Sequence, residues 1–230
     1  MLMNKYDIHI DINEAYRYMG CRGVPDNSLI NDLNSAAELI KIHSRPHVIK
    51  KICDIDRSKD LSLEGTCLKL EGKSIAALLH ECKMCVIFCA TIGNDIEALI
   101  RKWQIKDITF AAMLDACASS AVECLCNHVE KELSEEYSAQ GYHLTDRFSP
   151  GYGDLPLSIQ SDFCAVLDTC RKIGVCVSES GIMIPRKSVT AIIGISHKEQ
   201  KHYITGCNDC RLMDGCNFRK NGVTCYGQVI

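Results

Sequence analysis

The longest continuous helical pattern in the sequence runs from Asp107 to about Ser138. Its first half, AAMLDACASSAVECLC, is crowded with Ala, Ser and Cys, whereas its second half, NHVEKELSEEYS, is charged and expected to face water. Small side chains allow another element, or a ligand, to come close to a helix backbone. The sequence therefore predicts one long helix whose first half is closely approached from outside.

Patterns on both sides of this helix predict further helices and strands. Before it, helices are predicted up to Gly20, from Ser28 onward, and from a cap at Asn94 to Trp103. After it, an amphipathic helix is predicted over residues 158–173, ended by Gly174. Strands are predicted in HVIKKICDID, TCLKLEG, CVIFCAT, VCVSES and SVTAIIGIS, with a strand-like start in DIHIDI.

The domain organisation follows from these elements. The chain has 230 residues, shows no internal repeat, low-complexity segment or clear linker, and is long enough to bury a core. We predict one α+β domain over residues 1–203 and a small Cys-rich appendage over residues 204–230.

Charge and hydropathy exclude several classes of function. The formal net charge is -3 and no basic run is present, so nucleic acid is not an expected partner. The first twenty residues lack the apolar core and cleavage site of a signal peptide. No apolar run is expected to cross a bilayer, and we expect a cytoplasmic protein.

Cysteine is the compositional outlier, with sixteen in the chain. A disulfide framework belongs to small secreted proteins, whereas many of these cysteines lie at apolar positions inside helix or strand patterns. We therefore predict mostly reduced, buried thiols that act as small hydrophobic side chains. Cys82, Cys85 and Cys89 run into an apolar strand and are assigned to the core.

The last segment is different, because its cysteines are not on an apolar stripe. CNDCRLMDGCNFRKNGVTC is short, polar and contains glycine. Four thiolates at this spacing suit zinc or an iron–sulfur cluster, and the spacing does not decide between the two. The alternatives are a tail of reduced thiols or a CxxC redox pair. The candidate ligands are Cys207, Cys210, Cys216 and Cys225.

The loop DRFSPGYGDLPLS, residues 146–158, is rich in Pro and Gly and predicts a defined shape that is neither helix nor central strand. Arg147 could hold a carboxylate through two parallel hydrogen bonds, and Tyr152 offers a flat ring with a polar tip. Gly151 and Gly153 would let backbone groups approach a ligand. The alternative is a rigid turn that packs on the core and binds nothing.

Acidic residues also lie along one side of the long helix. Asp115, Ser119 and Glu123 follow one another at a spacing of four residues. The acids could pair with a cationic group of a ligand. Alternatively, they meet Arg or Lys from another element, or face water.

Several motifs together resemble the activation domain of cobalamin-dependent methionine synthase. They are RFSPGYGDLPL, a following helix, and then IGVCVSESGIMIPRKSVTAIIGIS. The upstream pieces AYRYMGCRG, ATIGNDIEALI and LDACASSAVE look like freestanding versions of this domain, so the resemblance covers roughly residues 12–197. One departure is that the family's aromatic pair after the Ser-Val segment is replaced by aliphatic residues or Gly around Ile192–Ile195.

The resemblance implies a fold, a ligand and a role. The family domain is α+β, with helices around a twisted antiparallel sheet, and it binds S-adenosylmethionine. It covers an oxidised cobalamin, which an electron from flavodoxin, ferredoxin or a similar donor and the methyl group of S-adenosylmethionine restore to methylcobalamin. By this match Arg147 holds the carboxylate of the ligand and Glu123 is the acidic partner. The residues that the match assigns to the ligand are Arg147, Ser149, Pro150, Gly151, Tyr152, Gly153, Glu123 and Glu179.

Three functions are consistent with these features. The first is a freestanding activation subunit that binds S-adenosylmethionine and docks on a cobalamin-bearing methionine synthase or related corrinoid protein, since the chain has no cobalamin-binding module of its own. The second is a reductive activator in which the Cys-rich segment holds a cluster. The third is a zinc-tied interaction module without catalytic activity.

Overall fold

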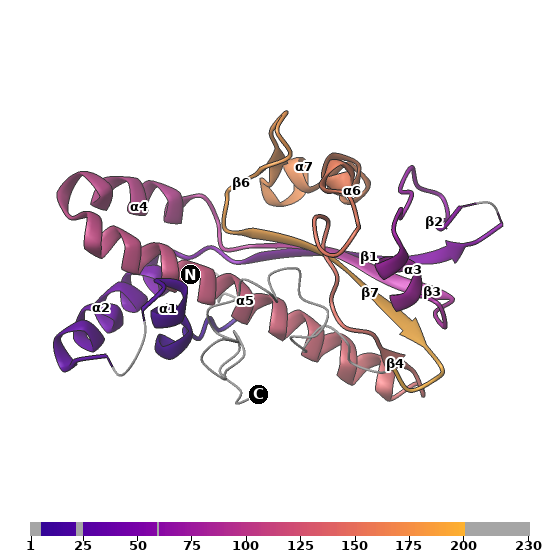
Figure 1. Ribbon diagram of the computed structural model, residues 1–230, viewed down its shortest axis with the longest axis horizontal. Helices are drawn as coiled ribbons and strands as arrows, with labels where there is room; N and C mark the ends of the chain where they lie inside the picture. The colour runs from indigo at the N-terminus through magenta and orange to yellow at the C-terminus, as the bar shows by residue number, and fades with distance from the viewer. Residues whose placement is uncertain (1–5, 22–24, 59, 201–230) are drawn as a thin grey trace.

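A computed structural model describes residues 6–21, 25–58 and 60–200 of the chain (Figure 1). The helices are α1 (Ile12–Tyr18), α2 (Asn27–His43), α3 (Lys73–Leu78), α4 (Asp95–Lys106), α5 (Ile108–Ser138), a 3-10 turn η1 (Leu157–Ile159), α6 (Gln160–Leu167) and α7 (Thr169–Ile173). The strands are β1 (His47–Asp56), β2 (Ser62–Leu63), β3 (Met84–Thr91), β4 (His143–Leu144), β5 (Cys176–Val177), β6 (Met183–Ile184) and β7 (Ser188–Ser196).

Five of the strands form one antiparallel sheet, in the order β2-β1-β3-β7-β4, and β5 and β6 form a separate hairpin. Helices α1, α2, α4 and α5 lie on one side of the sheet, and α6 and α7 lie on the other (Figure 1). The predicted α+β class, an antiparallel sheet with surrounding helices, is confirmed.

Strand β3 is buried over most of its length because both faces of the sheet are covered. Val86, Phe88 and Ala90 belong to the core beneath α5, whereas Cys85 and Cys89 belong to the core beneath α3 and α6. A strand that is buried on both faces is apolar at every position rather than at alternate ones. The run CVIFCAT was therefore a reliable signal of this strand.

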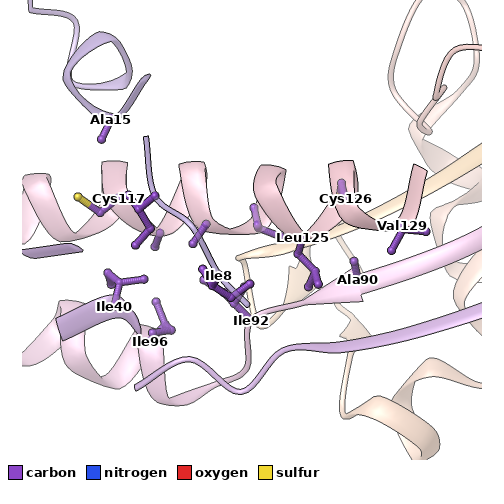
Figure 2. Packing of buried hydrophobic residues seen from close by; sticks show 14 of the residues in the cluster. Ile8, Ala15, Ile40, Ala90, Ile92, Ile96, Cys117, Leu125, Cys126 and Val129 are labelled. Carbon is purple, nitrogen blue, oxygen red and sulfur yellow. The ribbon is translucent and has the colours of Figure 1, made fainter. Parts of the chain in front are cut away.

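Helix α5 is the central element of the larger core. The side chain of Asp107 accepts hydrogen bonds from the backbone N–H groups of Thr109 and Phe110, which fixes the start of the helix. Residues from α2, α4 and the N-terminal segment pack around small side chains in its first half, including Cys117 (Figure 2). Other elements of the protein, rather than a ligand, thus make the predicted close approach to the first half of this helix.

By length and composition α5 could cross a membrane, which differs from the sequence expectation. However, 56% of its apolar window is buried inside the protein. The core helix of a globular domain passes the same test. We assign the apolar residues of α5 to the core.

Four predicted elements differ from the structure. The helix predicted over residues 158–173 is broken at Asp168, which is left-handed at φ 56° and whose carboxylate pairs with Arg171 at 2.7 Å. TCLKLEG forms a single bridge between Lys69 and Ser62. VCVSES forms a strand only at residues 176–177 before a turn, and DIHIDI forms no strand over its described residues.

The cysteines of the described residues are mostly reduced and buried, as predicted. Seven of the ten free cysteines are buried, and burial raises the pKa of Cys82 to about 11 and that of Cys117 to about 12. Such thiols are protonated at neutral pH and weakly reactive. The prediction was wrong for Cys170 and Cys176, which form a disulfide.

Gly194 on β7 lies where a loop after α3 packs directly on the sheet. A Cβ atom at this position would lie 2.5 Å from the Sγ atom of Cys82 and 2.8 Å from a methyl group of Leu79. Thr145 would be 2.9 Å away. Glycine is therefore required here by close packing.

We expect Gly194→Ala to lower the free energy of unfolding by about 1–3 kcal/mol, because it overfills a closed core. Urea denaturation of the variant and the wild type measures the change. In a Cys82→Ala background the cost of Gly194→Ala should be smaller, because the nearest clashing atom is gone. An unchanged midpoint for the single variant would contradict this account of Gly194.

Candidate functional site

A groove of about 1130 Å³ lies between α5, the loop that contains Arg147, and the start of β7. Its floor is mixed in character, with Ile193 and Val189 beside the buried polar pair Gln160 and Thr190. The Nε2 atom of Gln160 donates to the Oγ1 atom of Thr190 at 2.7 Å. Five of the predicted ligand residues line the groove, namely Glu123, Arg147, Ser149, Pro150 and Tyr152.

The loop is fixed to the sheet at its start. Phe148 and Ile192 exchange backbone hydrogen bonds of 2.9 and 2.8 Å, and the backbone N–H of Thr145 donates to the carbonyl of Gly194. Within the loop, Gly151 N–H donates to the carbonyl of Leu155 at 3.0 Å. The predicted defined shape therefore arises from backbone hydrogen bonds in addition to its prolines.

Asp154 fixes the other end of the loop to α3. Its carboxylate accepts hydrogen bonds from the backbone N–H groups of Lys73 at 2.6 Å and Ser74 at 2.9 Å. It thus caps a helix that lies some eighty positions earlier in the chain. The residue at the start of that helix, Gly72, has no side chain to supply the cap, and a Cβ there would lie 2.7 Å from Asp154.

The two glycines of the loop have different roles from those predicted. Neither Gly151 nor Gly153 is among the residues that line the groove. A Cβ on Gly153 would lie 2.9 Å from the hydroxyl of Ser74 and 3.0 Å from the ring of Phe148. Gly153 therefore allows close contact between the loop and the protein itself, and its contact with a ligand stays a prediction.

Arg147 connects the loop to α5 through two carboxylates. Its Nη2 atom lies 2.7 Å from the Oε2 atom of Glu123, and its Nε atom lies 3.3 Å from the Oε1 atom of Glu130. The Nη1 atom is buried and has no hydrogen-bond partner among the described residues. One edge of the guanidinium is thus held by the protein, and Nη1 on the other side has no acceptor among the described residues.

The charges around Arg147 stabilise its cationic form. Burial works to lower the pKa of the guanidinium, but Cys126, Glu130 and Glu123 outweigh burial and raise that pKa. Arg147 is therefore a fixed cation that is only one-fifth exposed. A buried charge with an unsatisfied donor favours an anionic acceptor such as a carboxylate.

The other acid predicted on α5 is paired with cations from another element. Asp115 lies 3.0 Å from Lys187 Nζ and 3.5 Å from Arg186 Nη2, and Lys187 also donates to Ser119 at 2.8 Å. These residues line a second cavity of about 800 Å³. The alternative in which Asp115 meets Arg or Lys from another element therefore holds, and Glu123 likewise meets Arg147.

The remaining predicted residues lie elsewhere. Glu179 is exposed on the turn between β5 and β6 and does not line the groove, so its role stays a prediction. The candidate metal ligands Cys207, Cys210, Cys216 and Cys225 lie outside the described residues, as does the domain boundary at 203. Within the described residues, no group of three or more His, Cys, Asp or Glu could hold a metal ion.

Two features of the site were missed by sequence reasoning. Glu130 lies seven residues after Glu123, on the same side of the helix, and this spacing could have indicated it. Gln160 and Thr190 come from elements that are thirty positions apart, and only the fold brings them together. No local signal in the sequence indicates that pairing.

The fold and the groove define a ligand-binding domain built around a half-buried arginine. Residues 75–213 match the family model described as "Vitamin B12 dependent methionine synthase, activation domain". Because this match spans more than half of the sequence, the chain belongs to that family, and the resemblance found from the motifs is confirmed.

A solved structure shows the same fold. The crystal structure of the MetH reactivation domain bound to AdoHcy superposes with a TM-score of 0.64 at 15% sequence identity. The match covers 94% of this chain and 82% of that chain. A search of curated proteins found no match.

The cap on α3 leads to a prediction about pH. Hydrogen bonds from the N–H groups of Ser74 and Lys73 lower the pKa of Asp154 below its ordinary value. A carboxyl group with a lowered folded-state pKa adds stability above its unfolded pKa of about 3.9, and this contribution is lost as the pH falls through the folded value. Asp154→Ala should therefore lower Tm at pH 7, and the difference from wild type should shrink toward pH 3.

Thermal denaturation followed by circular dichroism at both pH values provides the measurement. Asp154→Asn retains one acceptor oxygen and should fall between wild type and the alanine variant at pH 7. A gap between wild type and the alanine variant that is equal at the two pH values would contradict a role for the charged carboxylate.

Proposed function

We propose that this chain is a subunit that binds S-adenosylmethionine and takes part in the reductive remethylation of a corrinoid on another protein. The observation that carries the proposal is the cation Arg147, which lines the groove and whose Nη1 donor has no hydrogen-bond partner among the described residues. Membership of the activation-domain family and the AdoHcy ligand of the similar structure support the same ligand class.

The charges of the site complement the amino-acid end of S-adenosylmethionine. The carboxylate of the ligand fits Arg147, and its ammonium group fits Glu123, which pairs with the same guanidinium. An arginine beside a carboxylate is a suitable receptor for a zwitterion. A ligand with only a carboxylate would add a third negative charge to this cluster.

The rest of the groove can take a nucleoside. Its volume of about 1130 Å³ is slightly above the range of roughly 300–1,000 Å³ for small-molecule pockets. Tyr152, Leu157 and Met183 supply aromatic and apolar surface, and Gln160 and Thr190 supply polar groups. Ile193 belongs to the segment in which this chain lacks the family's aromatic pair. It would keep an apolar contact with the ligand but could not stack on the adenine ring.

The proposed contribution of the protein is positioning rather than acid–base chemistry. S-adenosylmethionine supplies the methyl group, and the fixed guanidinium orients the amino-acid end so that the sulfonium methyl faces the open side of the groove. The corrinoid would be held by a cobalamin-binding methionine synthase or a related protein. Flavodoxin or ferredoxin would supply the electron, and we propose that the system operates in the cytoplasm.

We expect Arg147→Gln to weaken S-adenosylmethionine binding by at least about tenfold, because hydrogen bonds to charged groups contribute about 1.5–3 kcal/mol. Loss of the cation also leaves Glu123 and Glu130 unpaired, which would destabilise the fold. The double variant Arg147→Gln, Glu123→Gln removes one charge of each sign and limits this cost. Isothermal titration calorimetry measures affinity, and circular dichroism checks folding.

Arg171→Gln is the matched control, because Arg171 forms a carboxylate pair with Asp168 on the surface, away from the groove. Its affinity should equal that of the wild type. If a folded Arg147 variant also bound S-adenosylmethionine as tightly as wild type, the assignment of this arginine to the ligand carboxylate would be wrong.

The partner arrangement requires a separate test. The protein, S-adenosylmethionine and reduced flavodoxin are mixed with methionine synthase that carries cob(II)alamin but lacks its own activation domain. We expect the absorption spectrum to change to that of methylcobalamin, and to remain unchanged when this protein is omitted. Persistence of cob(II)alamin in the complete mixture, with S-adenosylmethionine bound, would contradict action on this partner.

A further inference from the structure

The groove and the second cavity differ in the net charge of the residues that line them, although some residues line both. The cavity of about 800 Å³ is lined by two carboxylates, Asp115 and Glu123, and by the two cations Arg186 and Lys187. The larger groove is lined by five carboxylates and two cations, so its lining carries a net charge of -3 when all are ionised. The larger groove therefore favours a ligand with net positive charge.

Glu130 contributes to this excess at the point where the ligand would be anchored. Arg147 faces both Glu123 and Glu130, so the three side chains together carry one negative charge. The two acids are seven residues apart on α5, which places them about 10 Å apart along the helix axis. Their carboxylates nevertheless converge on one edge of the guanidinium, so a ligand held by Arg147 has both acids nearby.

The proposed methyl donor and its product differ in one charge. S-adenosylmethionine has a carboxylate, an ammonium and a sulfonium, and so has one net positive charge. Its demethylated product, AdoHcy, has a neutral thioether and no net charge. Arg147 and Glu123 suffice for the carboxylate and the ammonium that both molecules share. The additional acid, Glu130, matches the charge that only the methyl donor has.

We propose that Glu130 is a specificity-determining residue that makes the groove prefer the sulfonium methyl donor over its uncharged product. This inference rests on the proposed function. At a separation on the order of 7 Å in water, one opposite charge changes affinity by roughly two- to tenfold. The preference would favour release of the product after each methyl transfer.

The test compares dissociation constants for S-adenosylmethionine and AdoHcy by calorimetry at low ionic strength. We expect the wild type to prefer S-adenosylmethionine, and Glu130→Gln to reduce that preference by roughly two- to tenfold. Glu130→Asp retains the charge and should retain the preference. The preference of the wild type should also fall as salt is added, because ions screen the attraction.

Glu136→Gln is the matched control, since Glu136 is also on α5 but pairs with Lys50 and does not line the groove. Its preference should equal that of the wild type. Glu130 also holds the Nε atom of Arg147, so Glu130→Gln could weaken both ligands together by loosening the guanidinium. An equal loss for the two ligands would show that Glu130 only positions Arg147 and would overturn the proposal.

The outcome separates this inference from the proposed function. If the wild type binds both ligands but Glu130→Gln leaves their affinity ratio unchanged, the inference fails and the proposed function stands. If the wild type binds neither ligand, the proposed function fails, and the specificity role of Glu130 fails with it.

Discussion

The packing of helix α5 determines both the core and the site. One side of the helix is buried against α1, α2, α4 and the sheet, which fixes its position and rotation. Glu123 and Glu130 project from the same helix into the groove, so the core fixes the two acids that hold Arg147. The packing of α5 thus fixes the backbone positions of both acids in this charge cluster.

The loop that carries Arg147 is held from three directions. Phe148 joins it to β7, Asp154 joins it to α3, and Arg147 itself joins it to α5. Each attachment is made by a different part of the sequence. The guanidinium is therefore preorganised before any ligand binds, which lowers the cost of ordering the site on binding. This arrangement is consistent with a protein that acts by positioning.

The parts of this structure that sequence reasoning predicted correctly are those with continuous local signals. The long helix, the apolar strand β3 and the loop around Arg147 each have a pattern within a single segment. The break at Asp168 depends on one left-handed residue, and the cap from Asp154 depends on a contact across some eighty positions. Gly153 was assigned to a ligand because sequence cannot distinguish close approach to a ligand from close approach to Ser74. Glu130 was missed because its charge pattern also fits a solvated helix face.

The two cavities have Tyr18, Glu123 and Tyr152 in common. A ligand that fills one cavity and displaces these side chains also changes the shape of the other cavity. Their occupancies are then thermodynamically linked, and the linkage acts equally in both directions. A ligand beside Lys187 would therefore change the affinity of the neighbouring groove for its own ligand, even if the two ligands made no contact.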